Sequence, residues 1–202
     1  NVPLVAFGRT QSKDDWSIAY VDIDGSAGVR LAVEHLLAQG HRRIAALGWP
    51  EESRVGSDRL SGYWAAMETA GISIDPAWVK RGAGEYEYGY VAALDLLDLP
   101  ARRRPTAIVT VFDLIAVGAM QAVQDRGLTV GHDVAITGFD DMPVILYLRP
   151  GLTTVRQPVW EVGERVVNIL VCLLEGRDPG PQHILLPPGL VIRESSQGYQ
   201  AH

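Results

Sequence analysis

The chain alternates short apolar runs, rich in β-branched residues, with longer segments in which apolar residues recur at the spacing of a helix face. The short runs predict strands, because a strand buried on both faces carries apolar side chains in succession. The longer segments predict amphipathic helices. The strands expected on this basis are 4–7, 17–23, 44–48, 107–111, 134–138, 153–155 and 190–192.

The expected helices have recognisable ends. They cover 25–39, 58–70, 90–97, 113–126 and 159–174. A glycine stands at or just past the predicted end of four of them, where helices commonly stop; these are Gly40, Gly71, Gly127 and Gly176. Ser57 stands beside the start of the second helix, and Asp113 is placed to cap the fourth.

Regular alternation of strands and helices predicts an α/β fold with parallel sheets covered on both faces. The runs 44–47, 107–111 and 134–136 are almost continuously apolar, as doubly buried parallel strands should be. At 202 residues the chain is long enough to bury a substantial core.

Composition excludes several classes of protein. With 47% hydrophobic and 21% charged residues the chain is typical of a soluble globular protein. It has no apolar run of ~18 residues, so we expect no membrane span. Its one cysteine, Cys172, excludes an intramolecular disulfide. With 18 basic and 24 acidic residues the net charge is −6, so any DNA contact has to come from residues outside this sequence.

The sequence starts at Asn1 and enters an apolar run at once, without a Met or a secretion-type leader. We therefore expect that it begins inside a larger protein. Nucleophile elbows, phosphate-binding loops and His-Glu-x-x-His helices are missing from it. The five histidines have no spacing typical of metal ligands. The prediction is a protein that is not an enzyme and needs no metal or cofactor.

Polar and aromatic residues gather just after the predicted strands. In open parallel sheets, ligands bind beyond the carboxyl ends of the strands. Arg59 and Asp140 can each bind two adjacent hydroxyls or ring nitrogens, which makes them the strongest candidates. For Asp24 and Asp113, helix capping is an open alternative to ligand binding. The candidates are Asp24, Ser53, Arg59, Phe112, Asp113, Asp140 and Asp141.

Several blocks of sequence resemble the lactose-repressor/galactose-repressor (LacI/GalR) family of bacterial transcription regulators. The most specific are Gly-Phe-Asp-Asp at 138–141 and Leu-Thr-Thr-Val-Arg-Gln-Pro at 152–158. Arg-Leu-Ser-Gly-Tyr at 59–63 and Leu-Val-Ile-Arg-Glu-Ser at 190–195 add to them. The resemblance extends over essentially the whole chain, with the blocks in family order.

The resemblance implies an effector-binding core of two Rossmann-like subdomains with parallel sheets, joined by three crossovers, as in type I periplasmic binding proteins. By the family pattern, residues 1–23 and 157–186 form the N-terminal effector subdomain, which is incomplete here. Residues 24–156 and 187–202 form the C-terminal one. The DNA-binding headpiece that opens a full-length member is not in this sequence.

The same resemblance places Arg59 and Asp140 at effector-contacting positions. Three departures from the family concern the ligand. Phe112-Asp113 replaces the Asn-Asp of many sugar-responsive members, and Gly8-Arg9 stands where several keep an Asp. Gly84 occupies the usual aromatic stacking position, so Tyr86 is expected to supply that ring. The predicted effector-binding set is Arg59, Asp140, Asp113, Phe112, Ser53, Tyr86, Asp24 and Arg9.

The function implied is a ligand-sensing core that binds a small effector between its lobes and alters operator affinity. We expect a sugar or polyol, with a purine as the open alternative. The expected partners are operator DNA, through the headpiece, and a second copy of the chain, in the cytoplasm and without a membrane. Apolar residues near Met120 and at 144–147 are candidates for the dimer surface, with ordinary partial burial as the open alternative for each. The alternative function is a periplasmic sugar-binding protein of a transport system, which shares the two-lobed fold.

Overall fold

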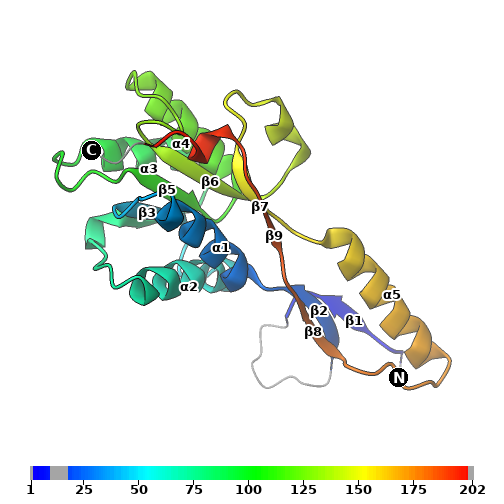
Figure 1. Ribbon diagram of the computed structural model, residues 1–202. Coiled ribbons are helices and arrows are strands. Elements are labelled where there is room, and N and C mark those ends of the chain that lie inside the picture. The colour runs from blue at the N-terminus through cyan, green and yellow to red at the C-terminus, as the bar shows by residue number, and fades with distance from the viewer. Residues whose placement is uncertain (1, 10–17, 200–202) are drawn as a thin grey trace. The chain divides into compact units, whose positions relative to one another are not determined.

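The computed structural model describes residues 2–9 and 18–199, and these form two compact units. Unit 1 comprises Asn1–Asp24 and Gln157–Pro188. Unit 2 comprises Gly25–Arg156 and Gly189–His202, so the chain passes between the units three times. Each unit combines helical structure with a parallel or largely parallel sheet (Figure 1), and the predicted α/β class is confirmed.

Unit 2 is built on a six-stranded sheet. Its strands are β3 (Ile44–Gly48), β4 (Val79–Arg81), β5 (Ala107–Thr110), β6 (Ala135–Asp140), β7 (Thr153–Arg156) and β9 (Gly189–Val191). Their order is β4-β3-β5-β6-β7-β9, and all neighbours are parallel except β7 and β9. From β3 the chain moves outward to β4 and then returns to β5 on the other side of β3. The strand order therefore reverses between β3 and β5.

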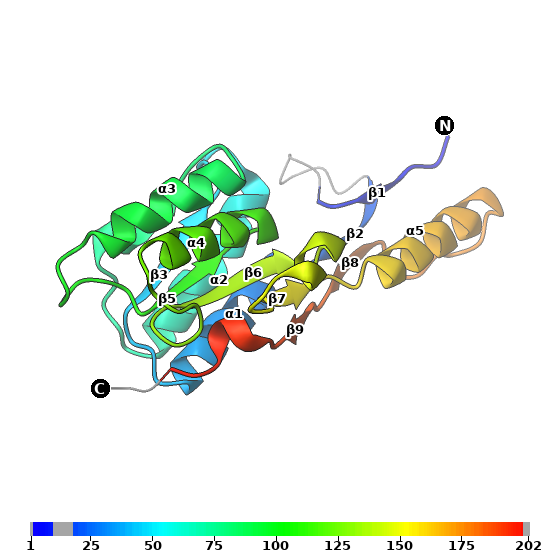
Figure 2. The ribbon, with the colours of Figure 1, turned by 90° about the horizontal axis from the view of Figure 1, so that it is seen from above.

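Two helix pairs cover the faces of this sheet (Figure 2). One pair is α1 (Gly25–Ala38) and α2 (Arg54–Thr69), and the other is α3 (Tyr86–Leu97) and α4 (Asp113–Asp125). The helices within a pair lie so close that their backbones touch. A Cβ on Gly62 of α2 would lie 2.0 Å from the Ser26 carbonyl oxygen of α1. Only glycine leaves room for that approach.

Unit 1 has a smaller parallel sheet of order β1-β2-β8, formed by Val5–Phe7, Ala19–Ile23 and His183–Leu186. The helix α5 (Val159–Leu174) packs on β1 and β2. Its small apolar core consists of Ala19, Val21, Ile23, Val162, Ile169 and Leu186. Much of the apolar surface of α5 stays exposed, and Trp160 is 83% accessible to solvent.

The structure corrects several predicted boundaries. Helix α2 begins at Arg54, not near Asp58, because Ser53 caps it: the Ser53 hydroxyl accepts a hydrogen bond from the Gly56 amide at 3.1 Å. Ser57, expected beside the start, lies inside the helix. Helix α3 begins at Tyr86 rather than at 90. The short strands β4 and β8 were not predicted.

The described residues include three short 3-10 helices, η1 (Pro76–Trp78), η2 (Pro143–Tyr147) and η3 (Glu194–Ser196). In η2, Val144, Leu146 and Tyr147 are exposed, whereas Ile145 is buried. Met120 on α4 is buried as well. Of the apolar residues expected on a dimer surface, Met120 and Ile145 therefore belong to the core of unit 2.

Candidate functional site

The carboxyl ends of β3, β5 and β6 meet at one edge of the unit 2 sheet, since these strands are parallel and adjacent. An ion pair between Arg59 and Asp140 lies at this edge. The Arg59 Nη2 donates to the Asp140 Oδ1 at 3.1 Å. Arg59 comes from the second turn of α2, and Asp140 ends β6. Residues 81 positions apart in the sequence are thus brought into contact.

Arg59 is held on several sides, and only 7% of its surface is exposed. Its Nη1 donates to the Val111 carbonyl at 2.7 Å, which ties it to the end of β5. The guanidinium carbon lies 3.8 Å from the centroid of the Phe139 ring. A charged group fixed in this way is preorganised to recognise a polar ligand without losing side-chain entropy.

Two aromatic side chains lie beside this ion pair. Trp49 directly follows β3, and its ring centroid is 5.4 Å from that of Phe112, with 50° between the ring planes. The Arg59 guanidinium carbon is also 5.4 Å from the Trp49 centroid. Both rings pack partly against the core of unit 2. The edge therefore combines a fixed cation, a carboxylate and two apolar ring faces.

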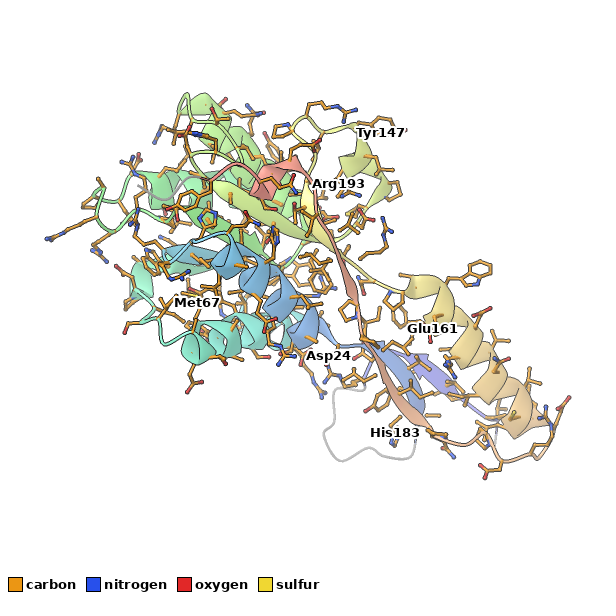
Figure 3. The ribbon with its side chains drawn as sticks, viewed as in Figure 1. Asp24, Met67, Tyr147, Glu161, His183 and Arg193 are labelled. Atoms are coloured by element: carbon orange, nitrogen blue, oxygen red, sulfur yellow. The ribbon has the colours of Figure 1, made fainter. Side chains whose placement is uncertain are left out.

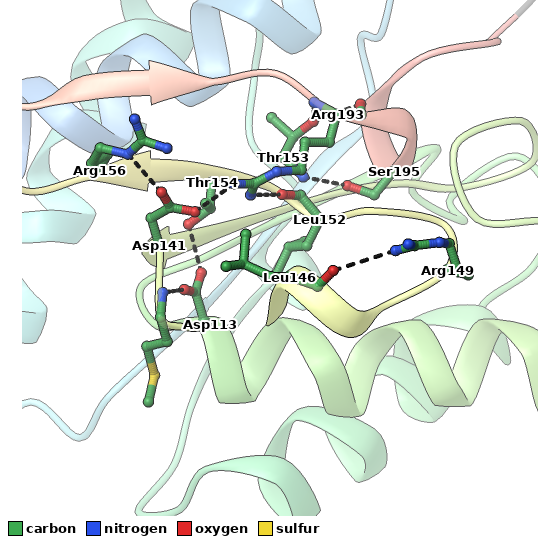
Figure 4. Close-up of polar contacts among 11 residues, drawn as sticks. Asp113, Asp141, Leu146, Arg149, Leu152, Thr153, Thr154, Arg156, Arg193 and Ser195 are labelled. Atoms are coloured by element: carbon green, nitrogen blue, oxygen red, sulfur yellow. Dashed lines mark hydrogen bonds and ion pairs between the residues drawn. The ribbon is translucent and has the colours of Figure 1, made fainter. Parts of the chain in front are cut away.

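The backbone bends sharply after β6. Asp140 has φ of 113° and Asp141 has φ of 54°, which lie in the region that non-glycine residues rarely occupy. Asp141 accepts hydrogen bonds from Arg193 at 2.7 Å and Arg156 at 2.6 Å (Figure 4). Burial opposes ionisation of Asp141, but the two guanidinium groups outweigh it and keep its pKa below the usual value.

Asp113 helps to fix the backbone bend that follows β6. Its Oδ1 accepts a hydrogen bond from the Thr154 hydroxyl at 2.5 Å, and its Oδ2 accepts one from the Met142 amide at 2.8 Å (Figure 4). The side chain is fully buried. Burial, reinforced by the charges of Asp140 and Asp141, raises the pKa of Asp113 to about 7 despite these hydrogen bonds. Asp113 thus fixes the turn that carries Asp140.

Comparison with known proteins decides the family. Residues 33–196 match the model of the periplasmic binding protein-like domain. A regulatory protein of the LacI family from Chloroflexus aggregans is 55% identical, with a TM-score of 0.91, over 97% of this chain and 69% of that one. The chain belongs to the LacI family. The resemblance expected from the sequence motifs is confirmed.

Two further relatives are less similar to this chain. The HTH-type transcriptional repressor PurR of Escherichia coli is 34% identical over 96% of this chain and 56% of its own length. The transcriptional regulator CelR, in its complex with cellobiose, is 34% identical with a TM-score of 0.85, over 95% of this chain and 58% of that chain. This chain thus spans just over half the length of the curated relatives it matches. These relatives are transcription regulators, which does not favour the alternative of a transport binding protein.

In this LacI-family core, some of the predicted site residues come together and others do not. Arg59, Asp140 and Phe112 meet at the carboxyl edge, as described. Asp113 neither contacts solvent nor caps α4, because both its oxygens are bound to residues of unit 2. A direct contact between Asp113 and an effector stays a prediction that this geometry does not support. Trp49 was not predicted, although its position directly after a strand marked it in the same way as the other candidates.

The remaining predicted residues have other surroundings. Ser53 caps α2, and Tyr86 is the first residue of α3, 38% exposed. The aromatic partner of Phe112 in the structure is Trp49. Arg9 and Asp24 belong to unit 1, where the Arg9 Nε donates to Asp22 at 2.7 Å. Their contact with an effector stays a prediction.

Within residues 2–9 and 18–199, no group of three His, Cys, Asp or Glu side chains is arranged to hold a metal ion. No helix in this part of the chain has the length and apolar character needed to cross a membrane.

Proposed function

We propose that this chain is the non-enzymatic, effector-binding core of a transcription regulator that binds a small polar molecule at the Arg59–Asp140 edge. Unit 1 is the partial N-terminal effector subdomain, and unit 2 is the C-terminal one. The observation that carries the proposal is the Arg59–Asp140 pair, almost buried and fixed at the carboxyl ends of parallel strands. Ligands of open parallel sheets bind at this edge.

The chemistry of this edge favours a neutral molecule rich in hydroxyl groups, a sugar or a polyol. A hydroxyl both donates and accepts hydrogen bonds, so vicinal hydroxyls can bind a carboxylate and a guanidinium together. The flat faces of Phe112 and Trp49 suit the C–H side of a sugar ring. A dianionic phosphate would need an excess of cations, whereas Asp140 already balances Arg59 here. The cellobiose complex of CelR supports a sugar as the effector class.

Regulation then requires that the effector binds one state of the protein more tightly than another, because only differential affinity shifts an equilibrium. A coupling of roughly 1–3 kcal/mol is sufficient for allosteric control. With a net charge of −6 the chain itself is poorly suited to bind DNA. We therefore assign operator binding to a headpiece outside these residues. Because the relatives are transcription regulators, which act on DNA inside the cell, we also place the protein in the cytoplasm.

The exposed apolar side chains of η2 support a homodimer. Val144 and Leu146 are more than half exposed, and Tyr147, labelled in Figure 3, is 84% exposed. Clustered apolar residues on the surface of a folded protein mark interaction sites. A symmetric pair of cores would bring two headpieces to two half-sites of an operator.

A thermal-shift screen of the full-length protein against sugars, sugar phosphates and nucleobases tests the effector site. We expect sugars to raise the melting temperature of the wild-type protein and of Arg103→Ala, in which the lost side chain is an exposed cation remote from this edge. The same sugars should have no effect on Arg59→Ala. Stabilisation only by phosphates would contradict the sugar assignment. Full stabilisation of Arg59→Ala by a ligand would show that the effector binds elsewhere.

A further inference from the structure

The strand order of the unit 2 sheet reverses between β3 and β5. This switch point lies at the carboxyl edge of the sheet. In open α/β sheets the crevice at such a switch point is where ligands bind, because the loops diverge there. Trp49 follows β3 directly, and Phe112 follows β5 after one intervening residue. The two aromatic rings thus flank the switch point, 5.4 Å apart.

The backbone at Trp49 is held in place by its neighbours. The Arg81 Nη1, from the end of β4, donates to the Trp49 carbonyl at 3.4 Å and to the Ser57 hydroxyl at 3.1 Å. Helix α2 approaches Trp49 so closely that a Cβ on Gly56 would lie 2.9 Å from the Trp49 Cβ. Aromatic side chains have few rotatable bonds, so a ring anchored in this way loses little entropy on binding a ligand.

We propose that Trp49 is a specificity-determining residue of the effector site and stacks on the C–H face of a sugar ring. In this arrangement Phe112 forms the adjacent apolar wall, and Arg59 and Asp140 bind the hydroxyls. The two ring centroids are only 5.4 Å apart and the ring planes are inclined by 50°, so the rings pack against each other and leave no slot between them for a flat nucleobase. A puckered sugar ring presents C–H groups in more than one direction and can lie on the outer faces of such an inclined pair. The inference rests on the proposed function.

Trp49 takes the role that the sequence had given to Tyr86. Tyr86 lies at the start of α3, on a chain segment that follows β4 at the outer edge of the sheet. Trp49, in contrast, follows the strand next to β5 and shares the cation Arg59 with Phe139. The aromatic position missing at Gly84 is therefore supplied from the loop after β3.

The test is isothermal titration and tryptophan fluorescence of the full-length protein with cellobiose, D-glucose, hypoxanthine and inorganic phosphate. Trp49→Ala should weaken sugar binding roughly tenfold or more, as expected when an aromatic stacking contact is lost. Trp49→Phe keeps an apolar ring, so its affinity should stay within about threefold of the wild type. It should nevertheless lose the fluorescence change that the sugar causes. Trp160→Phe, at an exposed residue of unit 1, is the matched control and should keep both.

The outcomes separate this inference from the proposed function. If Arg59→Ala abolishes sugar binding while Trp49→Ala leaves it unchanged, the role of Trp49 is refuted and the effector site stands. If sugar binding survives Arg59→Ala, the proposed site itself is wrong. Binding of hypoxanthine or phosphate alone, or of no compound at all, refutes a sugar-selecting Trp49. Should Trp49→Ala fail to fold, Trp49→Phe decides: a fluorescence change that persists in this variant overturns the inference.

Discussion

The buried carboxyl group of Asp113 makes the free energy of unfolding of unit 2 depend on pH. The carboxyl group is fully buried and faces the charges of Asp140 and Asp141, which lie on the bend after β6. Arg59 neutralises the first of these, and Arg156 and Arg193 neutralise the second. The substitution Asp113→Asn removes the ionisable group and keeps its size. The amide oxygen can accept from the Met142 N–H, as Asp113 does, and the amide nitrogen would donate to the Thr154 hydroxyl, which in this structure donates to Asp113.

Burial raises the pKa of Asp113 from 3.8 to about 7, which corresponds to roughly 4 kcal/mol of folding free energy. Between these values the native state retains a proton that the unfolded chain has released. The stabilisation is thus complete below about pH 4 and is lost as the pH rises through about 7. Asp113→Asn has no carboxyl group to ionise, so it does not lose this stabilisation as the pH rises. Relative to the wild type, the variant should therefore gain up to roughly 4 kcal/mol between pH 4 and pH 8.

Urea unfolding of both proteins at pH 5, 6, 7 and 8 measures this difference. Burial lowers the pKa of His41 to about 4, which gives a slope of opposite sign, but His41 contributes equally to both proteins and cancels. Asp125→Asn, an exposed carboxyl near the other end of α4, is the control and should follow the wild type. Parallel curves for wild type and Asp113→Asn would refute the reasoning.

Other predictions concern packing and assembly. Gly62→Ala should destabilise unit 2 by roughly 1–3 kcal/mol or more in urea unfolding, because its Cβ would overlap the α1 backbone. Gly163→Ala, on α5 with nothing within 4 Å of the added Cβ, should instead stabilise by roughly 0.5–1 kcal/mol. Ser195→Ala removes a buried hydroxyl that accepts from the Thr153 amide (Figure 4) and donates to the Ile136 carbonyl, and it should cost roughly 1–3 kcal/mol in urea unfolding. Tyr147→Glu should weaken self-association in sedimentation equilibrium, and an unchanged monomer fraction would refute a dimer through η2.

The parts of the fold that the sequence predicts well are those in which one physical signal dominates. The strands β3 and β5 are buried at every position, and β6 is buried at every position except Asp140, so all three are mainly apolar. Helix α5 matches its predicted range of 159–174 because its apolar stripe is strong and a glycine follows it. The strands β4 and β8 escaped prediction since they are short and partly exposed, and β4 carries Lys80 and Arg81.

The sequence predicts a site residue only where the residue's own type and position indicate its role. Arg59 and Asp140 meet as expected, although 81 positions separate them. Asp113 looked like a cap or a ligand contact, but its partners come from the turn after β6 and from β7, which no local pattern indicates. Trp49 was overlooked because its significance depends on strand order. Only the sheet topology shows that β3 and β5 flank the switch point.

Operator affinity with and without a bound sugar tests the central claim most directly. In a mobility-shift titration of the full-length regulator, a sugar that binds the core should change operator affinity by ~5–150-fold, as expected for allosteric coupling of ordinary strength. Arg59→Ala should bind the operator as the wild type does without sugar, and should not respond when sugar is added. An operator affinity that sugar leaves unchanged in the wild type, or changes equally in Arg59→Ala, would contradict this account.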